Sequence, residues 1–202
     1  MEYEIKKVAA QPDWAAIPSL KIDYPYFDTP KDVSAFAQIA YNDDALFVHM
    51  RLVAPEIRNE EKGTLGMPCM DSCLEFFFCP MEGDNRYFNM EFNLGGCMFL
   101  GMGTSKKDLT RFAIDRPDIL FSFRSVRTED GFEIDYQVPY HFIRRLFPDF
   151  KVYPGKWMRA NCYSCAQKAE RQHFLSWNPI LGDPFTFHRT DGFGTMIFTE
   201  KR

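Results

Sequence analysis

Most of this chain consists of short stretches in which apolar and polar residues alternate, and very little of it has helical periodicity. Residues 87–93 are an example, with Phe88, Met90 and Phe92 alternating with polar or tyrosine positions. A period of two places every second side chain on the same face of a β-strand. Turn-forming sequences separate these stretches roughly every 8 to 15 residues, as a β-rich chain requires. We therefore expect one β-rich domain over residues 1–202, without the crossover helices of a βαβ fold.

About ten strands and one short helix can be assigned from this pattern. The helix is expected over residues 141–147, where Pro148 ends it. Many short strands with almost no helix are typical of sandwiches and jelly rolls. The predicted fold class is therefore all-β, an antiparallel β-sandwich with jelly-roll character. The expected strands cover residues 35–41, 45–52, 74–79, 87–93, 97–100, 119–127, 132–138, 157–163, 174–177 and 194–198.

Charge and hydropathy argue against two classes of partner. The net charge is −4, so no basic surface is expected that would neutralise a phosphate backbone, and we predict no nucleic-acid partner. No apolar run approaches the roughly 18 residues that span a bilayer, so we predict no membrane association. Residues 1–7 contain no apolar signal-peptide core, which predicts a cytoplasmic protein. The six cysteines are then expected to be reduced, buried thiols.

Three of the expected strands carry polar side chains on one face. Glu75 shares a face with Cys73 and Phe77, although it lies within the apolar run 74–78. A buried carboxylate there needs a partner such as Arg159, Arg51 or a ligand hydroxyl. Amides, carboxylates and guanidinium groups match paired sugar hydroxyls, and aromatic rings match the apolar face of a pyranose. An ordinary solvated sheet face is the alternative interpretation. The other polar-face residues are Tyr87, Asn89, Glu91, Asn93, Trp157, Arg159, Asn161 and Tyr163.

Several of these segments resemble those of family-9 carbohydrate-binding modules, in particular the stand-alone bacterial proteins that are similar to that family. Residues 71–77, Asp-Ser-Cys-Leu-Glu-Phe-Phe, resemble the D-S-(C)-V-E-F-F segment of the family, and residues 87–93 resemble its Y-[YF]-N-F-E-F-N strand. Residues 159–163 resemble R-A-N-x-Y and residues 175–179 resemble the family's S-W-N-P segment. The match continues through Phe187-His188-Arg189 and Phe193-Gly194, in the same order along the chain.

The resemblance implies a β-sandwich that binds sugar between two tryptophan side chains. Trp177 corresponds to one of these tryptophans, Glu75 to the glutamate of the family's strand, and Asn89 to a polar position on the next strand. The position of the first tryptophan holds Cys69, so the sequence does not contain an intact clamp. Some members bind calcium, but no ligand set can be matched here, so we predict no metal and no cofactor.

The resulting hypothesis is non-catalytic binding of a mono- or oligosaccharide. Trp177 stacks on a sugar ring with Asn178 beside it. Hydrogen bonds to sugar hydroxyls come from Glu75, Asn89, Glu91, Arg159 and Asn161, and the flanking aromatic residues are Tyr87, Trp157 and Tyr163.

Three alternatives stay open at this point. Glu75 and Glu91 would suit a glycoside hydrolase, whose mechanism depends on the separation of the two carboxyl groups. A sandwich that has lost its ligand would serve as a protein-interaction or structural domain, which Cys69 favours. A zinc site at Cys162 and Cys165 would need a second pair of cysteines, and buried thiols are the preferred interpretation. The sequence does not predict an oligomeric state.

Overall fold

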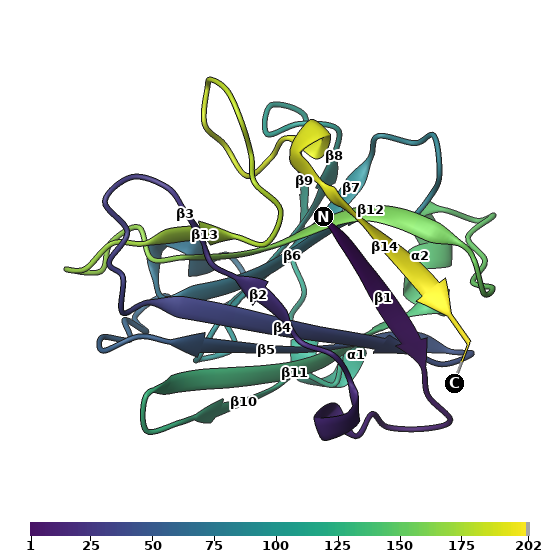
Figure 1. The fold of residues 1–202 in the computed structure, drawn as a ribbon, viewed down its shortest axis with the longest axis horizontal. Coiled ribbons are helices and arrows are strands. Elements are labelled where there is room, and N and C mark those ends of the chain that lie inside the picture. Colours follow the sequence, from purple (N-terminus) through teal and green to yellow (C-terminus); the bar gives the residue numbers. More distant parts are fainter. Residues whose placement is uncertain (201–202) are drawn as a thin grey trace.

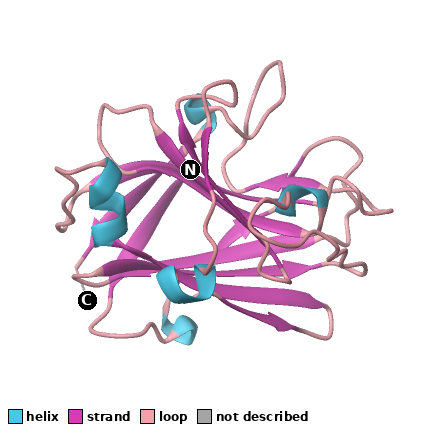
Figure 2. Cartoon of the chain, turned by 180° about the vertical axis from the view of Figure 1, so that it is seen from behind, coloured by secondary structure: helices cyan, strands magenta, loops and turns pink. Residues whose placement is uncertain are grey.

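The computed structural model of the protein describes residues 1–200 and consists of fourteen strands with a few helical turns (Figure 1). The helical turns lie at the periphery of the strands (Figure 2). The two α-helices are α1 (Pro117–Leu120) and α2 (Tyr140–Leu146), and the 3₁₀ turns are η1 (Trp14–Ala16), η2 (Pro68–Met70) and η3 (Thr190–Gly192). The strands are β1 (Glu2–Lys7), β2 (Leu20–Ile22), β3 (Tyr24–Pro25), β4 (Ser34–Tyr41), β5 (Ala45–Val53), β6 (Cys73–Cys79), β7 (Tyr87–Asn93), β8 (Met98–Gly103), β9 (Thr110–Phe112), β10 (Arg124–Arg127), β11 (Gly131–Pro139), β12 (Trp157–Cys165), β13 (Phe174–Ser176) and β14 (Gly194–Thr199).

All the strands belong to one continuous sheet, whose main path runs β10-β11-β5-β4-β1-β14-β12-β6-β7-β8-β9. The sheet curls so that the half containing β4, β5 and β11 faces the half containing β6, β7 and β12 (Figure 1). The sheet is mixed, because β1 pairs in parallel with both β14 and β4. Our expectation of a purely antiparallel sandwich was wrong at these pairings. A parallel pair needs a long connection instead of a tight turn, and the turn-based assignment cannot detect it.

The main core lies between the two halves of the curled sheet. Phe76 and Phe78 on β6 and Phe88 and Phe92 on β7 point into it, and Val48 on β5 approaches from the opposite half. All five side chains are fully buried. The alternate residues of β6 and β7 therefore point to the outer face of this half, which positions the candidate site.

The predicted elements agree with the structure except around residues 113–127. Residues 141–147 were expected to be helical, and α2 covers Tyr140–Leu146. The strand expected over 119–127 begins at Arg124, because α1 occupies Pro117–Leu120. Proline suits the first position of a helix, where its missing N–H is not needed, and the sequence reading overlooked this signal. The prediction also missed the short strands β2, β3 and β9 and the N-terminal β1. No helix within residues 1–200 is long and apolar enough to cross a membrane.

Candidate functional site

The polar residues of β6, β7 and β12 lie side by side on the outer face. Glu75 pairs in register with Glu91 on one side and with Tyr163 on the other. The next row brings Asn89 opposite Phe77. Directly opposed residues on one face of an antiparallel pair have Cβ atoms about 4.5–5.5 Å apart, so the two carboxyl groups are immediate neighbours.

This face is covered by the chain segment that follows β13, and two tyrosines hold that segment in place. The Tyr87 hydroxyl and Nδ1 of His188 are 2.7 Å apart. The Tyr163 hydroxyl donates to the carbonyl of Phe187 at 3.1 Å, and the two rings stack with centroids 4.2 Å apart. Both tyrosines are fully buried. We expected them to flank a ligand, whereas the structure uses them to anchor a loop over the sheet.

A cavity of about 760 Å³ lies beneath this covering segment. Its floor contains Glu75, Asn89 and Glu91, which are three of the ten predicted site residues. Cys69 lines it as well, and Lys106 and Lys107 contribute positive charge. Its aromatic lining residues are Phe27, Phe99, Phe174, Phe185 and Phe187. The cavity therefore combines a polar floor with aromatic walls, and its volume is typical of a small-molecule site.

The two floor glutamates are buried and form no ion pair with another side chain of residues 1–200. Glu75 Oε1 accepts a hydrogen bond from the Cys165 thiol at 3.0 Å. Burial and the neighbouring Glu91 raise the pKa of Glu75 well above its usual range. Burial also raises the pKa of Glu91 to about 7, although the neighbouring Asn89 amide and the positive charge of Arg111 oppose this shift. The raised pKa values favour a proton on the pair, and a carboxyl group that holds a proton can donate as well as accept hydrogen bonds.

Polar atoms on the floor have unused hydrogen-bonding capacity. Asn89 is fully buried, and its amide forms no well-aligned hydrogen bond among residues 1–200, although it lies close enough to Glu91 to lower the pKa of that carboxyl group. Oε2 of Glu91 is also unpartnered there. A buried polar group without a hydrogen bond costs about 1–3 kcal/mol. A ligand that supplies both donors and acceptors would remove this cost.

Trp177 does not lie at this cavity. Its indole is 4 % exposed and belongs to the main hydrophobic core on the opposite face of the sheet. The indole packs so closely on Gly194 that a Cβ there would lie 2.8 Å from the ring. The expectation that Trp177 and Glu75 line one open hollow is therefore corrected. Trp157, half-buried at the start of β12, is also absent from the cavity lining.

Three further predicted residues form structural hydrogen bonds instead of lining the cavity. The Asn161 amide donates to the carbonyls of Asn178 and Gly192 and accepts from two backbone N–H groups, so all its capacity is used. Asn178 itself donates to the Gly192 carbonyl. Arg159 donates to Oδ1 of Asn85 at 2.7 Å and to the Thr190 carbonyl at 3.3 Å. These contacts connect the covering segment to β12.

Aromatic residues of two loops were missed because they have no strand pattern. Phe27 follows β3 and is 71 % exposed, and its ring lies 4.9 Å from Phe185 and 5.3 Å from Phe174. Its φ of 55° is in the left-handed region, which is strained for a residue with a bulky side chain. Strained backbone clusters at functional sites, and exposed apolar patches mark interaction surfaces, so both features favour a ligand site here.

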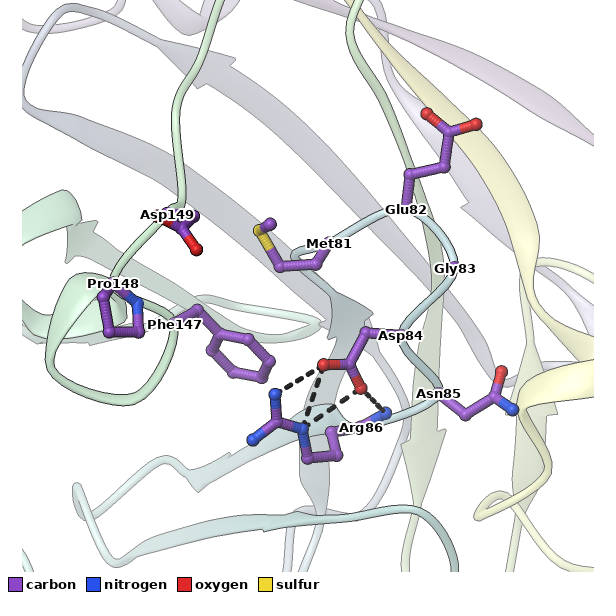
Figure 3. A pocket seen from close by; sticks show the side chains of 9 residues that line it. All are labelled: Met81, Glu82, Gly83, Asp84, Asn85, Arg86, Phe147, Pro148 and Asp149. Carbon is purple, nitrogen blue, oxygen red and sulfur yellow. Dashed lines mark hydrogen bonds and ion pairs between the residues drawn. The ribbon is translucent and has the colours of Figure 1, made fainter.

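A second cleft, of about 500 Å³, lies beside the β6–β7 turn and is shown in Figure 3. Its charged groups are largely occupied by each other, because Arg86 forms two-pronged contacts with the Asp84 carboxylate. The Arg86 guanidinium also lies 4.6 Å from the Phe147 ring centroid. This cleft therefore offers a ligand less free hydrogen-bonding capacity than the cavity over β6 and β7.

Residues 7–198 match the family model described as carbohydrate-binding family 9. The chain belongs to carbohydrate-binding family 9. A search of the curated proteins found no match.

Solved structures show the same fold. The family 9 chain is 26 % identical, with a TM-score of 0.81, to a candidate carbohydrate-binding protein from Bacteroides uniformis, and 98 % of each chain is covered. It is also similar to a family 9 carbohydrate-binding module from Caldicellulosiruptor kristjanssonii in complex with glucose, at 12 % identity and a TM-score of 0.71, over 100 % of this chain and 97 % of that one. A structure from the same organism, in complex with cellotriose, matches at 11 % identity and a TM-score of 0.66, over 100 % and 95 % of the two chains.

Proposed function

We propose that this family 9 protein binds a mono- or short oligosaccharide, without catalysis, in the cavity over β6, β7 and β8. The observation that carries the proposal is that the Asn89 amide and Oε2 of Glu91 form no well-aligned hydrogen bond among residues 1–200, on a floor walled by aromatic rings. Neighbouring hydroxyls of a sugar each donate and accept, so they satisfy such a set of groups. The glucose and cellotriose complexes of the Caldicellulosiruptor relatives support the choice of ligand class.

The aromatic contact in this proposal comes from the loops instead of from Trp177. Phe185 is half-buried at the cavity, and the exposed Phe27 lies against it. Phe99 contributes a third ring from β8. A phenylalanine ring presents an apolar face that suits the C–H groups of a pyranose. These rings compensate for Cys69, which occupies the position of one clamp tryptophan in the resemblance.

The test is a titration with glucose and cellotriose, followed by ligand-observed NMR because weak sugar affinity is expected. If neither sugar binds, a glycan array extends the search. Asn89→Leu keeps the branched shape and the number of side-chain heavy atoms but removes both polar groups of the amide. We expect the variant to fold as stably as the wild type and to bind at least tenfold more weakly, which corresponds to about 1.4 kcal/mol. Equal affinities of Asn89→Leu and the wild type would refute this site.

Phe185→Ala tests the aromatic wall, and Tyr153→Ala is its matched control. Tyr153 is 58 % exposed and does not line the cavity. We expect weaker sugar binding in Phe185→Ala and unchanged binding in Tyr153→Ala. A well-folded wild type that responds to no sugar on the array would favour the ligand-free interaction domain instead.

Glycoside hydrolysis is a second candidate function, which the adjacency of Glu75 and Glu91 favours. Retaining glycosidases place two carboxyl groups about 5–5.5 Å apart. However, Glu75 Oε1 already accepts a hydrogen bond from the Cys165 thiol, so this carboxyl group is engaged within the protein. Release of product from chromogenic glycosides, abolished in Glu75→Gln, would establish hydrolysis. We expect no release above the rate in buffer.

A further inference from the structure

Three donor groups of different strands meet below the cavity floor. Cys73 and Glu75 are on β6, and Cys165 is the register partner of Cys73 on β12. One ligand atom from each, the two Sγ atoms and a carboxylate oxygen, lie within 4.8 Å of one another. All three side chains are at most 2 % exposed. We refer to these three residues as the thiol–carboxyl cluster.

Two further groups lie next to the thiol–carboxyl cluster. The Cys165 thiol is 3.5 Å from the carbonyl oxygen of Cys69, which belongs to η2. Burial raises the pKa of Cys69, and the nearby Glu91, Cys165 and Glu75 raise it further. Oε2 of Glu91 is fully buried and has no partner within residues 1–200. Cys69 and Glu91 lie outside the group of ligand atoms within 4.8 Å, so either side chain would have to move closer to serve as a fourth donor.

No ion-paired side chain occupies the position that a cation would take in the cluster. Within residues 1–200, no lysine, arginine or histidine forms an ion pair with either glutamate. Arg111, which lies near, is engaged with loop carbonyls such as that of Gly66. A divalent cation would therefore compete with the protons of the buried thiols and carboxyl group and not with a basic side chain.

We propose that Cys73, Glu75 and Cys165 bind a thiophilic divalent cation of the zinc type, with Cys69 or Glu91 as the fourth ligand. Zinc prefers four tetrahedral ligands, with bonds of about 2.3 Å to sulfur and 2.0–2.2 Å to oxygen. Such bonds separate neighbouring donor atoms by about 3.4–3.8 Å, so the cluster needs little contraction. Calcium is disfavoured because it takes six to eight oxygen ligands and no thiolate.

Binding exchanges protons for the metal in a balanced way. The thiols of Cys73 and Cys165 each lose a proton as their Zn–S bonds form, and Glu75 loses its proton when it is the protonated member of the glutamate pair. The fourth ligand, the Cys69 thiol or a protonated Glu91, likewise loses its proton. These protons pass to solvent, and no oxidant or reductant is needed. Since Glu75 also belongs to the proposed sugar site, we expect zinc and sugar to weaken each other's binding by the same factor.

The C-x-x-C spacing at residues 162–165 does not form this site. Cys162 lies three residues from Cys165 and therefore points to the opposite face, into the main core. Cys162 is as buried as Cys165, at 0 % exposure. This makes Cys162→Ser a matched control for Cys165→Ser, because both remove a buried thiol from the same strand.

The test is a titration of the reduced, metal-stripped full chain with Co²⁺, which reports its own coordination. We expect one equivalent to produce thiolate-to-cobalt absorption and the intense visible bands of a tetrahedral site, and Zn²⁺ to displace it. Zinc should raise the melting temperature of the wild type and of Cys162→Ser but not of Cys165→Ser. The proposal would be overturned if the wild type showed no tetrahedral cobalt spectrum, or if Cys162→Ser lost the zinc-induced rise in melting temperature as completely as Cys165→Ser.

Two more measurements keep the result interpretable. If Cys165→Ser does not fold, the wild type is alkylated with and without zinc instead. We expect zinc to protect Cys73 and Cys165 from alkylation, and absence of this protection overturns the site. The metal site is also overturned if freshly purified protein contains a Cys73–Cys165 disulfide and, once this disulfide is reduced, the protein binds no metal. Sugar titrations in the presence of a chelator separate the two proposals, because sugar binding without metal binding rejects only the metal site.

Discussion

Glu91→Gln provides a direct test of the electrostatics of the cavity floor. Burial raises the pKa of Glu91 from 4.5 to about 7, so the folded protein holds this proton more tightly than the unfolded chain does. The resulting stabilisation is complete below about pH 4.5 and is lost as the pH rises through about 7. A pKa difference of about 2.5 is equivalent to about 3 kcal/mol. Glutamine stays neutral, so the variant avoids this loss.

We therefore expect the unfolding free energy of Glu91→Gln, relative to the wild type, to increase by about 2–3 kcal/mol between about pH 5 and about pH 8.5. The measurement is urea denaturation of both proteins over this range, with a chelator present so that no metal occupies the site. Burial lowers the pKa of His173 and of His188 to about 4, which gives the opposite pH dependence. These histidines are present in both proteins, and their contribution cancels in the difference.

Glu129→Gln is the control, because Glu129 is exposed in the turn between β10 and β11. Its stability difference from the wild type should not change with pH. A flat difference for Glu91→Gln as well, or one that decreases as the pH rises, would show that Glu91 is not a buried acid in the folded protein.

Three further predictions test the corrected residue roles. Trp177→Phe should lose about 1–3 kcal/mol of stability in urea denaturation, because the indole packs in the core, and should keep its sugar affinity within twofold. A large loss of sugar affinity in a folded Trp177→Phe variant would contradict this core role. Asn161→Ala removes four hydrogen bonds and should lower the free energy of unfolding by about 2–4 kcal/mol in the same assay. A decrease of less than about 1 kcal/mol would contradict the structural role of these hydrogen bonds. Tyr163→Phe removes the hydrogen bond to the Phe187 carbonyl but keeps the stacked ring. We therefore expect about 1 kcal/mol of destabilisation and faster amide hydrogen exchange near residue 187. An unchanged exchange rate would contradict the anchoring role of Tyr163.

Alternation along single strands was sufficient to predict much of the sheet and its two faces. The β6 and β7 assignments depend on a local period of two, and the structure has these strands at 73–79 and 87–93. The parallel pairing of β1 could not be obtained in this way, since it joins Glu2–Lys7 to residues nearly two hundred positions later. Local patterns contain no information about such contacts.

The candidate site shows the same division between local and distant information. Alternation places Asn89, Asn161 and Tyr163 on a polar face but does not say what covers that face. Asn161 and Tyr163 form hydrogen bonds with the segment around residues 178–192, while the Asn89 amide forms no well-aligned hydrogen bond with any residue that the structure describes. Polar residues on the same face of the sheet therefore have different roles. Those that contact the covering segment form structural hydrogen bonds with it, and those that do not are left for a ligand.

Cys69 shows how one position can keep its place in a site while its chemistry changes. In the family resemblance this position holds an aromatic clamp residue, and in the structure it still lines the cavity. A thiol cannot stack on a sugar, and the rings that face the cavity come from Phe27, Phe99 and Phe185 instead. The same thiol adjoins Glu91 and Cys165, where a tryptophan would exclude a cation by its size. Loss of one stacking surface and gain of a metal-ligating group are therefore two consequences of the same residue, so the sugar affinity and the cobalt spectrum have to be measured on the same sample.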